Sequence, residues 1–279
     1  MTQTVDERSW LDNVPSTRWS PRAAMCELWH FRHLVPALVT REIKLRYKQT
    51  LIGISWAVLQ PLLGMLVFTL VLGKLVDVGS EGLPYAVFVY AALVVWNSLS
   101  SGVSRAADSL TDDQASITKV YFPRLIAPLA AILPTLLDLA VSLGLLFVLM
   151  LIFGVAPSVA LLLTPLWCVA LVAVALSFGV WLSALNVLYR DVRYVLAFFL
   201  QLWFFATPVV YSSSLVADNL RWAYALNPAV GLVDGFRWSL IGGAPPPAAD
   251  LVSAVVTVAL LMSGLIFFRR VERQLADRI

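Results

Sequence analysis

Long apolar stretches without charge constrain this chain more than any other feature of its sequence. After Gly53 no charged residue occurs until Lys74. The hydrocarbon core of a bilayer, about 30 Å thick, requires roughly 20 apolar residues per helix, so this run is long enough to cross it. Further runs begin near Leu83, Leu125, Ser158, Tyr194 and Asp250. They are too long and too evenly apolar for barrel strands, so the sequence predicts an all-α integral membrane protein with six transmembrane helices.

The positions of the cations predict how these helices are oriented. If the N-terminus lies inside the cell, 17 of the 20 Lys and Arg residues fall on cytoplasmic segments, as the positive-inside rule requires. The first fifty residues contain no short apolar region typical of a signal peptide. We therefore expect both termini in the cytoplasm. The net charge of +3 then reflects topology rather than nucleic-acid binding.

Residues 34–52 show a helical pattern just before the first apolar run. At 100° per residue one arc is apolar, while Arg41, Lys44 and Lys48 lie opposite it, and Arg46 interrupts the apolar arc. The pattern predicts an amphipathic helix at the membrane interface, although the cations could also be ordinary positive-inside flanks. The expected organisation is therefore a cytosolic segment at 1–33, an interface helix at 34–52, and a six-helix transmembrane domain with a cytosolic tail at 53–279.

Prolines and one short apolar stretch modify this simple picture. Pro134, Pro165 and Pro208 lie within predicted spans and should kink them. Residues 227–243 are partly apolar but too short for a complete span, and they contain Asp234 and Arg237. A re-entrant or interfacial pair of helices on the outer side, before the last span, fits this stretch better than a crossing helix.

The sequence lacks the usual signs of catalysis. No Gly-rich loop with Lys and Ser or Thr follows a strand pattern, so no nucleotide site of that type is expected. His30 and His33 have no Cys or carboxylate neighbours at metal-ligand spacing, so no metal site is expected. No nucleophile, base and orienting residue can be assembled from neighbouring polar positions within the spans. We expect a chain that is not an enzyme.

Two features inside the spans are candidates for a transport path. Asp138 lies about 21 Å into the third span, where a carboxylate requires hydroxyl, amide or cationic partners or a proton. It either has a structural role or lines the substrate path. Aromatic residues recur at 198–211, where rings serve as packing or as surfaces on which sugars stack. The candidate channel or gate residues here are Trp203, Phe204, Phe205 and Tyr211.

Four separated motifs resemble the membrane subunit of ABC-type polysaccharide exporters. They are TREIKLRYKQTLIGISWAVLQPLLGMLVFTLVLGKL, ITKVYFPRLIAPLA, ALNVLYRDVRYVLAFFLQLWFFATPVVYSS and LNPAVGLVDGFRW. Their order and spacing are similar to those of permeases for O-antigen, teichoic acid, capsule and mycobacterial galactan. The resemblance extends from about residue 34 to the end of the chain.

The resemblance implies a homodimer in the bacterial inner membrane with two copies of a separate ATP-binding subunit, which would hold ATP and Mg²⁺. It also implies a coupling helix that docks on this partner, at Lys119, Val120, Tyr121, Phe122, Pro123 and Arg124. Gate helices would include Asn227, Pro228 and Arg237. Cations at the cytoplasmic entrance would attract the substrate's diphosphate or only anchor lipid headgroups, with Arg41, Lys44, Arg46 and Lys48 as candidates.

A polyprenyl-diphosphate-linked glycan is the substrate that the resemblance implies. Arg outnumbers Lys 16 to 4, which hints at a GC-rich genome and favours a galactan-type cell-wall precursor. The nearest alternative is the permease of an ABC-type drug or small-lipid exporter. A secondary transporter should show an inverted repeat and several ionisable groups at the midplane, and a membrane glycosyl- or acyltransferase needs an acid–base constellation at one interface.

Overall fold

The computed structural model describes residues 32–48, 53, 55–76, 78–112, 123–189, 191–243 and 245–278. In this part of the chain every regular element is helical, which confirms the predicted all-α fold class. The elements are α2 (Leu34–Tyr47), α3 (Ser55–Phe68), η2 (Thr69–Leu75), α4 (Tyr85–Asp112), α6 (Ile126–Ile132), α7 (Pro134–Phe153), η3 (Val159–Leu163), α8 (Thr164–Leu188), α9 (Val192–Phe205), η4 (Ser213–Leu215), α10 (Arg221–Tyr224), α11 (Pro228–Ile241), η5 (Ala248–Asp250) and α12 (Leu251–Arg278).

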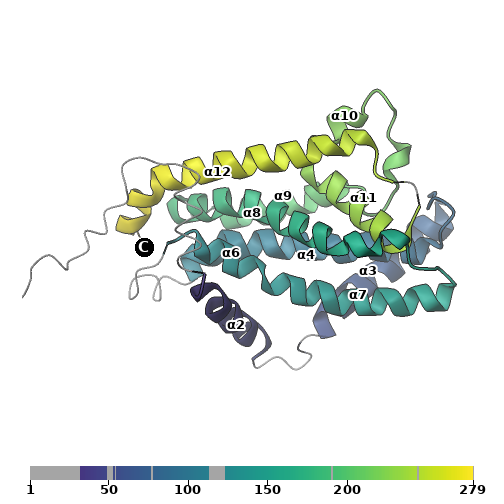
Figure 1. Ribbon diagram of the computed structural model, residues 1–279, viewed down its shortest axis with the longest axis horizontal. Helices are drawn as coiled ribbons and strands as arrows, with labels where there is room; N and C mark the ends of the chain where they lie inside the picture. The colour runs from purple at the N-terminus through teal and green to yellow at the C-terminus, as the bar shows by residue number, and fades with distance from the viewer. Residues whose placement is uncertain are drawn as a thin grey trace, which may run out of the picture.

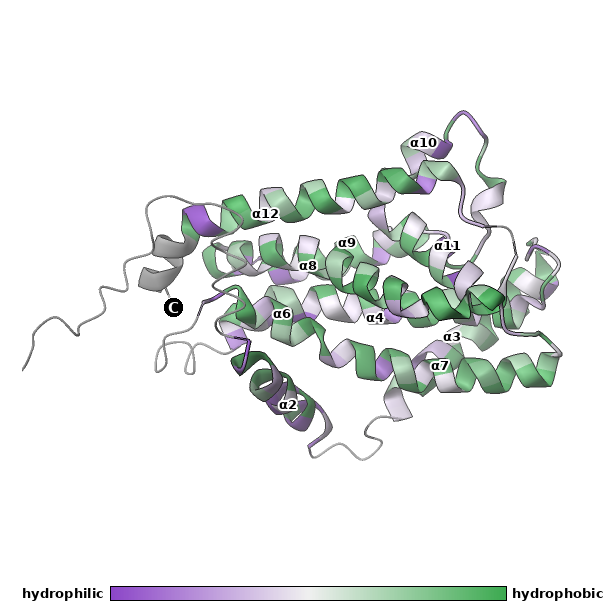
Figure 2. Ribbon diagram, viewed as in Figure 1, coloured by the Kyte–Doolittle hydropathy of each residue, from purple (hydrophilic) through white to green (hydrophobic). Residues whose placement is uncertain are grey.

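The long helices form a bundle with two distinct ends. Figure 1 shows α4, α7, α8 and α12 running side by side, with α2, α6 and the last turns of α12 at one end and α10 at the other. We call these the α2 end and the α10 end. In Figure 2 the long helices are mostly hydrophobic, while hydrophilic residues gather on α2 and near the ends of the bundle. This distribution is the one expected of helices that cross a membrane.

Among the residues that the structure describes, five helices are long and apolar enough to cross a membrane: Ser55–Leu75, Tyr85–Asp112, Ile126–Phe153, Val159–Leu188 and Ala248–Val271. The sixth predicted span, which begins near Tyr194, corresponds to α9. This helix has 14 residues and is therefore about 21 Å long, short of the roughly 30 Å of a hydrocarbon core. It ends three residues before Pro208, because the residue preceding a proline disfavours the helical conformation.

The three predicted proline kinks have different outcomes. A turn at Leu133, directly before Pro134, separates α6 from α7, so the predicted interruption is present. Pro165 lies in the first turn of α8, where a missing N–H costs nothing, and Pro208 follows the end of α9. Pro165 therefore lies just after the change from the 3-10 helix η3 to α8, and Pro208 lies beyond the helix that it was predicted to kink.

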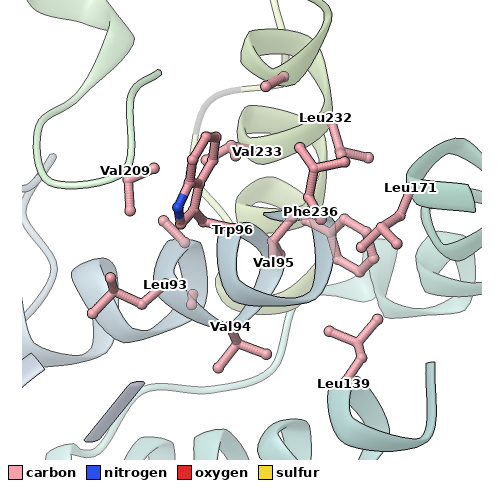
Figure 3. Packing of buried hydrophobic residues seen from close by; sticks show 14 of the residues in the cluster. Leu93, Val94, Val95, Trp96, Leu139, Leu171, Val209, Leu232, Val233 and Phe236 are labelled. Atoms are coloured by element: carbon pink, nitrogen blue, oxygen red, sulfur yellow. The ribbon is translucent and has the colours of Figure 1, made fainter. Parts of the chain in front are cut away.

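Helix α4 is the centre of the bundle. In the most apolar 18-residue stretch of α4, 83% of the residues are buried, against 11% in the corresponding stretch of Ser55–Leu75. Helix α4 contacts α3, α6, α7, α8, α9 and α11. In Figure 3 Val95 and Trp96 of α4 lie against side chains of α11, with Leu139 and Leu171 nearby. A Cβ atom added at Gly179 of α8 would lie 2.4 Å from the Cβ of Ala106, so α4 and α8 are in close contact there.

The short apolar stretch at 227–243 forms α11, a 14-residue helix that packs against α4, α8 and α12. Nearly all its side chains are buried. The indole of Trp167 covers Gly235 so closely that an added Cβ would lie 2.1 Å from the ring. The single turn of α10 precedes α11 at the α10 end of the bundle (Figure 1). That this region forms re-entrant or interfacial gate helices stays a prediction.

Candidate functional site

A groove of about 730 Å³ lies between α3 and α9, with α4 as its floor. Its lining combines three kinds of side chain that seldom occur together inside a membrane. The aromatic members are Phe68, Trp96, Phe204 and Phe205, the polar members are Gln60, Asn97, Ser100, Ser101, Ser104 and Gln201, and the charged member is Arg105. Intramembrane polar groups of this density are typical of a transport path.

The aromatic residues of the groove pack against one another. Phe204 stacks on Phe68 with ring centroids 5.8 Å apart and meets Trp96 edge-on at 5.7 Å. Trp203 is buried behind them, 6% exposed, with its ring 5.5 Å from that of Trp96. Of the four predicted aromatic candidates, Phe204 and Phe205 thus line the groove, while Trp203 supports it from the core.

The fourth aromatic candidate, Tyr211, lies away from the groove. Its hydroxyl donates to the carbonyl of Phe205 at 3.1 Å and shares a hydrogen bond of 2.9 Å with the hydroxyl of Tyr224. Burial and this second hydrogen bond raise the pKa of Tyr224 above its ordinary value, so its hydroxyl keeps its proton. Tyr211 therefore connects the end of α9 to α10.

The polar stripe on α4 is the part of the groove that sequence reasoning missed. Asn97, Ser101 and Arg105 recur at a spacing of four residues, which places them on one helix face. Within the described residues the side chains of these three make no hydrogen bond. They are open to a bound molecule. The sequence could have revealed this stripe, because polar residues that recur every four positions lie on one face of a helix.

Asp138 lies on α7 between two residues of α2, and it does not line the groove. Its carboxylate accepts a hydrogen bond from the Tyr47 hydroxyl and pairs with the guanidinium of Arg46. Asp138 is 6% exposed, so this pairing satisfies a carboxylate that would be costly alone. Asp138 also explains why Arg46 interrupts the apolar arc of α2. The arc faces α6 and α7, and Arg46 pairs with Asp138 of α7 there.

The remaining entrance candidates lie on other faces of α2. Lys44 and Lys48 are exposed, and Arg41 is half-buried. All three line a shallow depression on α2. Val35, Val39 and the other inward members of the arc are half-buried, as the helical pattern predicts, and α2 ends at Tyr47. The predicted extension to residue 52 lies outside the described residues.

Asn227 joins the end of α9 to the start of α11. Its side-chain oxygen accepts hydrogen bonds from the indole of Trp203 at 2.7 Å and from the backbone N–H of Ala229 at 3.0 Å. Its side-chain nitrogen donates to the Ala206 carbonyl at 3.0 Å and to the Thr207 hydroxyl at 3.1 Å. Pro228 follows in the first turn of the helix, so this Asn-Pro pair is a helix start of the expected type.

Arg237 is buried at the α10 end, 5% exposed. Its guanidinium lies 3.9 Å from the centre of the Phe88 ring, donates to the carbonyl of Pro208 at 2.5 Å, and pairs with Asp234 at 3.4 Å. It also lines a small cavity of about 170 Å³ with Glu81 and other polar residues. This predicted gate residue thus anchors the turn after α9 to α11.

The predicted coupling helix is only partly described. Lys119, Val120, Tyr121 and Phe122 lie outside the described residues. Pro123 is buried and Arg124 half-buried, and both precede α6 at the α2 end. Within the described ranges, no three His, Cys, Asp or Glu residues come together in a way that could hold a metal ion.

A polar groove between apolar helices is typical of membrane transport proteins, and comparison with known proteins identifies the family. The model of the ABC-2 type transporter family matches residues 33–241. The O-antigen export system permease protein RfbA of Myxococcus xanthus is 31% identical over 256 residues, which are 91% of this chain and 98% of that protein. Two proteins of the same name from Klebsiella pneumoniae are 24% and 22% identical over 88% of this chain and 94% of their own length.

The chain therefore belongs to the ABC-2 type transporter family. The resemblance to the membrane permeases of ABC polysaccharide exporters, predicted from four motifs, is confirmed.

Proposed function

We propose that this chain is the membrane subunit of an ATP-driven exporter that moves a polyprenyl-diphosphate-linked polysaccharide out of the cytoplasm across the bacterial inner membrane. The names of its relatives, O-antigen export permeases, support a polysaccharide as cargo. The cation distribution supports cytoplasmic termini, with the α2 end inside. The excess of Arg over Lys favours a galactan-type precursor.

The lining of the groove is the observation that carries this proposal. Sugar rings stack their apolar faces on aromatic side chains, and their hydroxyls form hydrogen bonds with amides and hydroxyls. Trp96 and Phe204 supply the rings, and Asn97 and Ser101 supply the hydrogen-bonding groups. An apolar drug would leave these polar groups unpaired, which costs free energy in a dry site. The groove is therefore better suited to a glycan than to a drug.

A second copy of this chain would close the groove into a tunnel. The helices that wall it, α3 and α9, keep large apolar side chains exposed in the monomer. On α3 these include Leu63, Leu66 and Val67, followed by Leu70 of η2, and on α9 they include Tyr194, Val195, Phe198 and Leu202. Two copies related by a two-fold axis would bring α3 and α9 of one against the same helices of its partner. We propose this homodimer as the working form.

Energy would come from two copies of a separate ATP-binding subunit that holds ATP and Mg²⁺. We propose that the segment ending in Pro123 and Arg124 docks on this partner, because it immediately precedes α6 at the α2 end. Closure of the partner dimer on ATP would move α6 and the helices in contact with it. The walls of the groove, α3 and α9, would part to open the tunnel, and hydrolysis would reset it.

The test uses the complete complex, with its ATP-binding partner, in sealed vesicles. We expect ATP-dependent translocation of lipid-linked polysaccharide and none of a hydrophobic drug. Ser101→Trp should abolish translocation, because the indole would fill the groove floor, while the complex still assembles and hydrolyses ATP. Val148→Trp is the matched control, since Val148 lies exposed on α7 outside the groove. Drug transport without polysaccharide transport, or an active Ser101→Trp variant, would contradict the proposed function.

A further inference from the structure

Arg105 borders two cavities at once. It lines the groove between α3 and α9, and it also lines a second cavity of about 430 Å³ between α2 and the neighbouring ends of α4 and α6. We call the latter the α2 cavity. Arg41, Glu42 and Leu45 of α2 form its other wall. A molecule that passes from α2 into the groove therefore meets the Arg105 guanidinium.

The charge of Arg105 has no contact partner in the described part of the chain. Its electrostatic neighbours there are the carboxylates of Asp138 and Glu42, the hydroxyl of Tyr47 and the cation of Arg46, and none of them forms a hydrogen bond or ion pair with it. Asp138 already receives both Arg46 and Tyr47. A half-buried guanidinium with five N–H donors is thus left without an acceptor.

The carboxylates of Asp108 and Asp112 do not act as the missing acceptor for Arg105. Asp108 accepts hydrogen bonds from Arg193 at 2.9 Å and from Asn186 at 3.0 Å, and Asp112 pairs with Arg193 at 2.9 Å. Both carboxylates line the α2 cavity, but both are engaged by Arg193 from α9. Their engagement leaves Arg105 available to an anion from outside the chain.

The groove itself points to the kind of anion. Arg105 is its one charged lining residue among those described, and it stands at the end nearest α2. From Arg105 to Trp96 is nine residues, or about 14 Å along α4. A chemical group attached to an anion at Arg105 would therefore lie beside Ser101, Asn97 and Trp96. A phosphate fits the planar donor fork of arginine in two parallel hydrogen bonds.

We propose that Arg105 binds the lipid-borne phosphate to which the first sugars of the cargo are joined, with the polar stripe of α4 holding those sugars. The proposal rests on the proposed function and makes it specific. According to this proposal, the cation that binds the phosphate is Arg105 inside the bundle rather than a cation on the exposed face of α2. Lys44 and Lys48 would attract the phosphate, Arg46 is occupied by Asp138, and Arg105 receives it.

Two lipids carry this chemistry: a polyprenyl diphosphate and an anionic phospholipid. Binding to the full-length protein in phosphatidylcholine nanodiscs distinguishes them, with undecaprenyl diphosphate as one radiolabelled probe and phosphatidylglycerol as the other. We expect Arg105→Gln to weaken binding of undecaprenyl diphosphate about 10- to 100-fold, the range for loss of hydrogen bonds to a charged group. Arg105→Lys should recover part of it, because the charge remains without the fork.

The control is Lys74→Gln, which removes a cation in η2 at the far end of the first span and should leave binding unchanged. A loss confined to undecaprenyl diphosphate identifies the carrier as the ligand. An equal loss for phosphatidylglycerol identifies a general lipid-phosphate site. If neither probe binds Arg105→Gln more weakly than wild type, the proposal is wrong. Thermal unfolding of each variant shows whether any loss is only misfolding.

Failure of this inference is separable from failure of the proposed function. If Arg105→Gln binds undecaprenyl diphosphate as tightly as wild type and the complete complex still exports polysaccharide in vesicles, the proposed phosphate site is wrong. The proposed export function is then unaffected. If the wild-type complex exports no polysaccharide, the proposed function fails whatever Arg105 binds.

Discussion

Two Arg–Asp pairs with a buried carboxylate lie at opposite ends of the bundle, and they differ in what they connect. Arg237 and Asp234 are three residues apart on one helix, α11, and the arginine also binds backbone carbonyls after α9. Arg46 and Asp138 come from different helices, α2 and α7. The first pair fixes a turn within the core, and the second holds a whole helix against the bundle.

The surroundings of the two pairs explain the difference. Around Arg237 nearly every residue of α11 is buried, whereas α2 has no buried residue among its 14. If Arg237 lost its partners, the core would have to reorganise. If Arg46 lost its partner, α2 could separate from α7 while the bundle stayed intact. The comparison teaches that a buried ion pair can serve rigidity or reversible docking, depending on what else holds its helices.

The largest effect should follow from breaking the rigid pair. Arg237→Ala leaves Asp234 as an uncompensated buried charge and removes the donor for the Pro208 carbonyl. We expect the free energy of unfolding to fall by about 3 to 5 kcal/mol, measured by denaturation of the purified protein in detergent. Arg221→Ala is the control, because its partner Asp218 is exposed and Arg221 itself is only half-buried, and it should cost about 1 kcal/mol or less. Equal losses in both variants would remove the distinction between the two ends.

The docking pair is tested by a double-mutant cycle with Arg46→Met and Asp138→Leu. Each single change leaves one charge without its partner, so each should release α2, and the double variant should restore part of the docking. The readout is the rate of thiol labelling of Ile43→Cys on the inward arc of α2. We expect a coupling of about 0.5 to 3 kcal/mol. Additive effects would show that the two residues do not hold α2 together.

A smaller effect should show whether the α10 end depends on more than Arg237. Asn227→Ala removes the cap of α11 and leaves the indole N–H of Trp203 without its acceptor. The expected loss is about 1 to 2 kcal/mol in the free energy of unfolding. Asn219→Ala removes an exposed amide from the preceding segment and should cost nothing measurable. A stable Asn227→Ala variant would assign the rigidity of this end to Arg237 alone.

The smallest effect concerns the hydroxyl that assists the docking pair. Tyr47→Phe should weaken the docking of α2 by about 1 kcal/mol in the same labelling assay. Burial and the hydrogen bond to Asp138 raise the pKa of Tyr47 from 10.0 to about 12. A raised pKa stabilises the docked form fully below pH 10.0, and this contribution is lost as the pH rises towards 12. The labelling rate of the Ile43→Cys variant, divided by that of an unfolded thiol at the same pH, should therefore not change across the physiological pH range.

Most of the fold could be predicted because the membrane imposes it. A charge-free run of sufficient length must be helical, since its backbone groups have no other partners in lipid. The Asn227–Pro228 pair likewise predicts a helix start, because the local geometry of a helix N-terminus favours these two residue types. Hydropathy did not predict which helix lies at the centre. The span in α4 is less apolar than Ser55–Leu75, yet 83% of its most apolar stretch is buried, against 11% in Ser55–Leu75. Lipid accepts an apolar face as readily as protein does.

The site was less accessible to sequence reasoning because its pairs are distant along the chain. Arg46 and Asp138 were both noted as exceptions, one to a pattern and one to the cost of a buried charge, but nothing local joins residues so far apart. In the sequence Arg105 is one of the cations that the positive-inside rule assigns to cytoplasmic segments, and nothing local gives it another role. Only its spacing from Asn97 and Ser101 linked it to the polar stripe, and that link has meaning once α3 and α9 are known to wall a groove.

The contact at Gly179 and Ala106 bears on how a transport cycle can proceed. Because only the Ala106 methyl group lies between the two backbones there, a shift of α4 along α8 would bring a bulkier side chain into this contact. We expect these two helices to keep their relative position while α2, α3 and α9 change theirs. The distances between successive hydrogen-bonding groups on α4 would then be the same at every stage, so each incoming sugar would meet an unchanged row of partners.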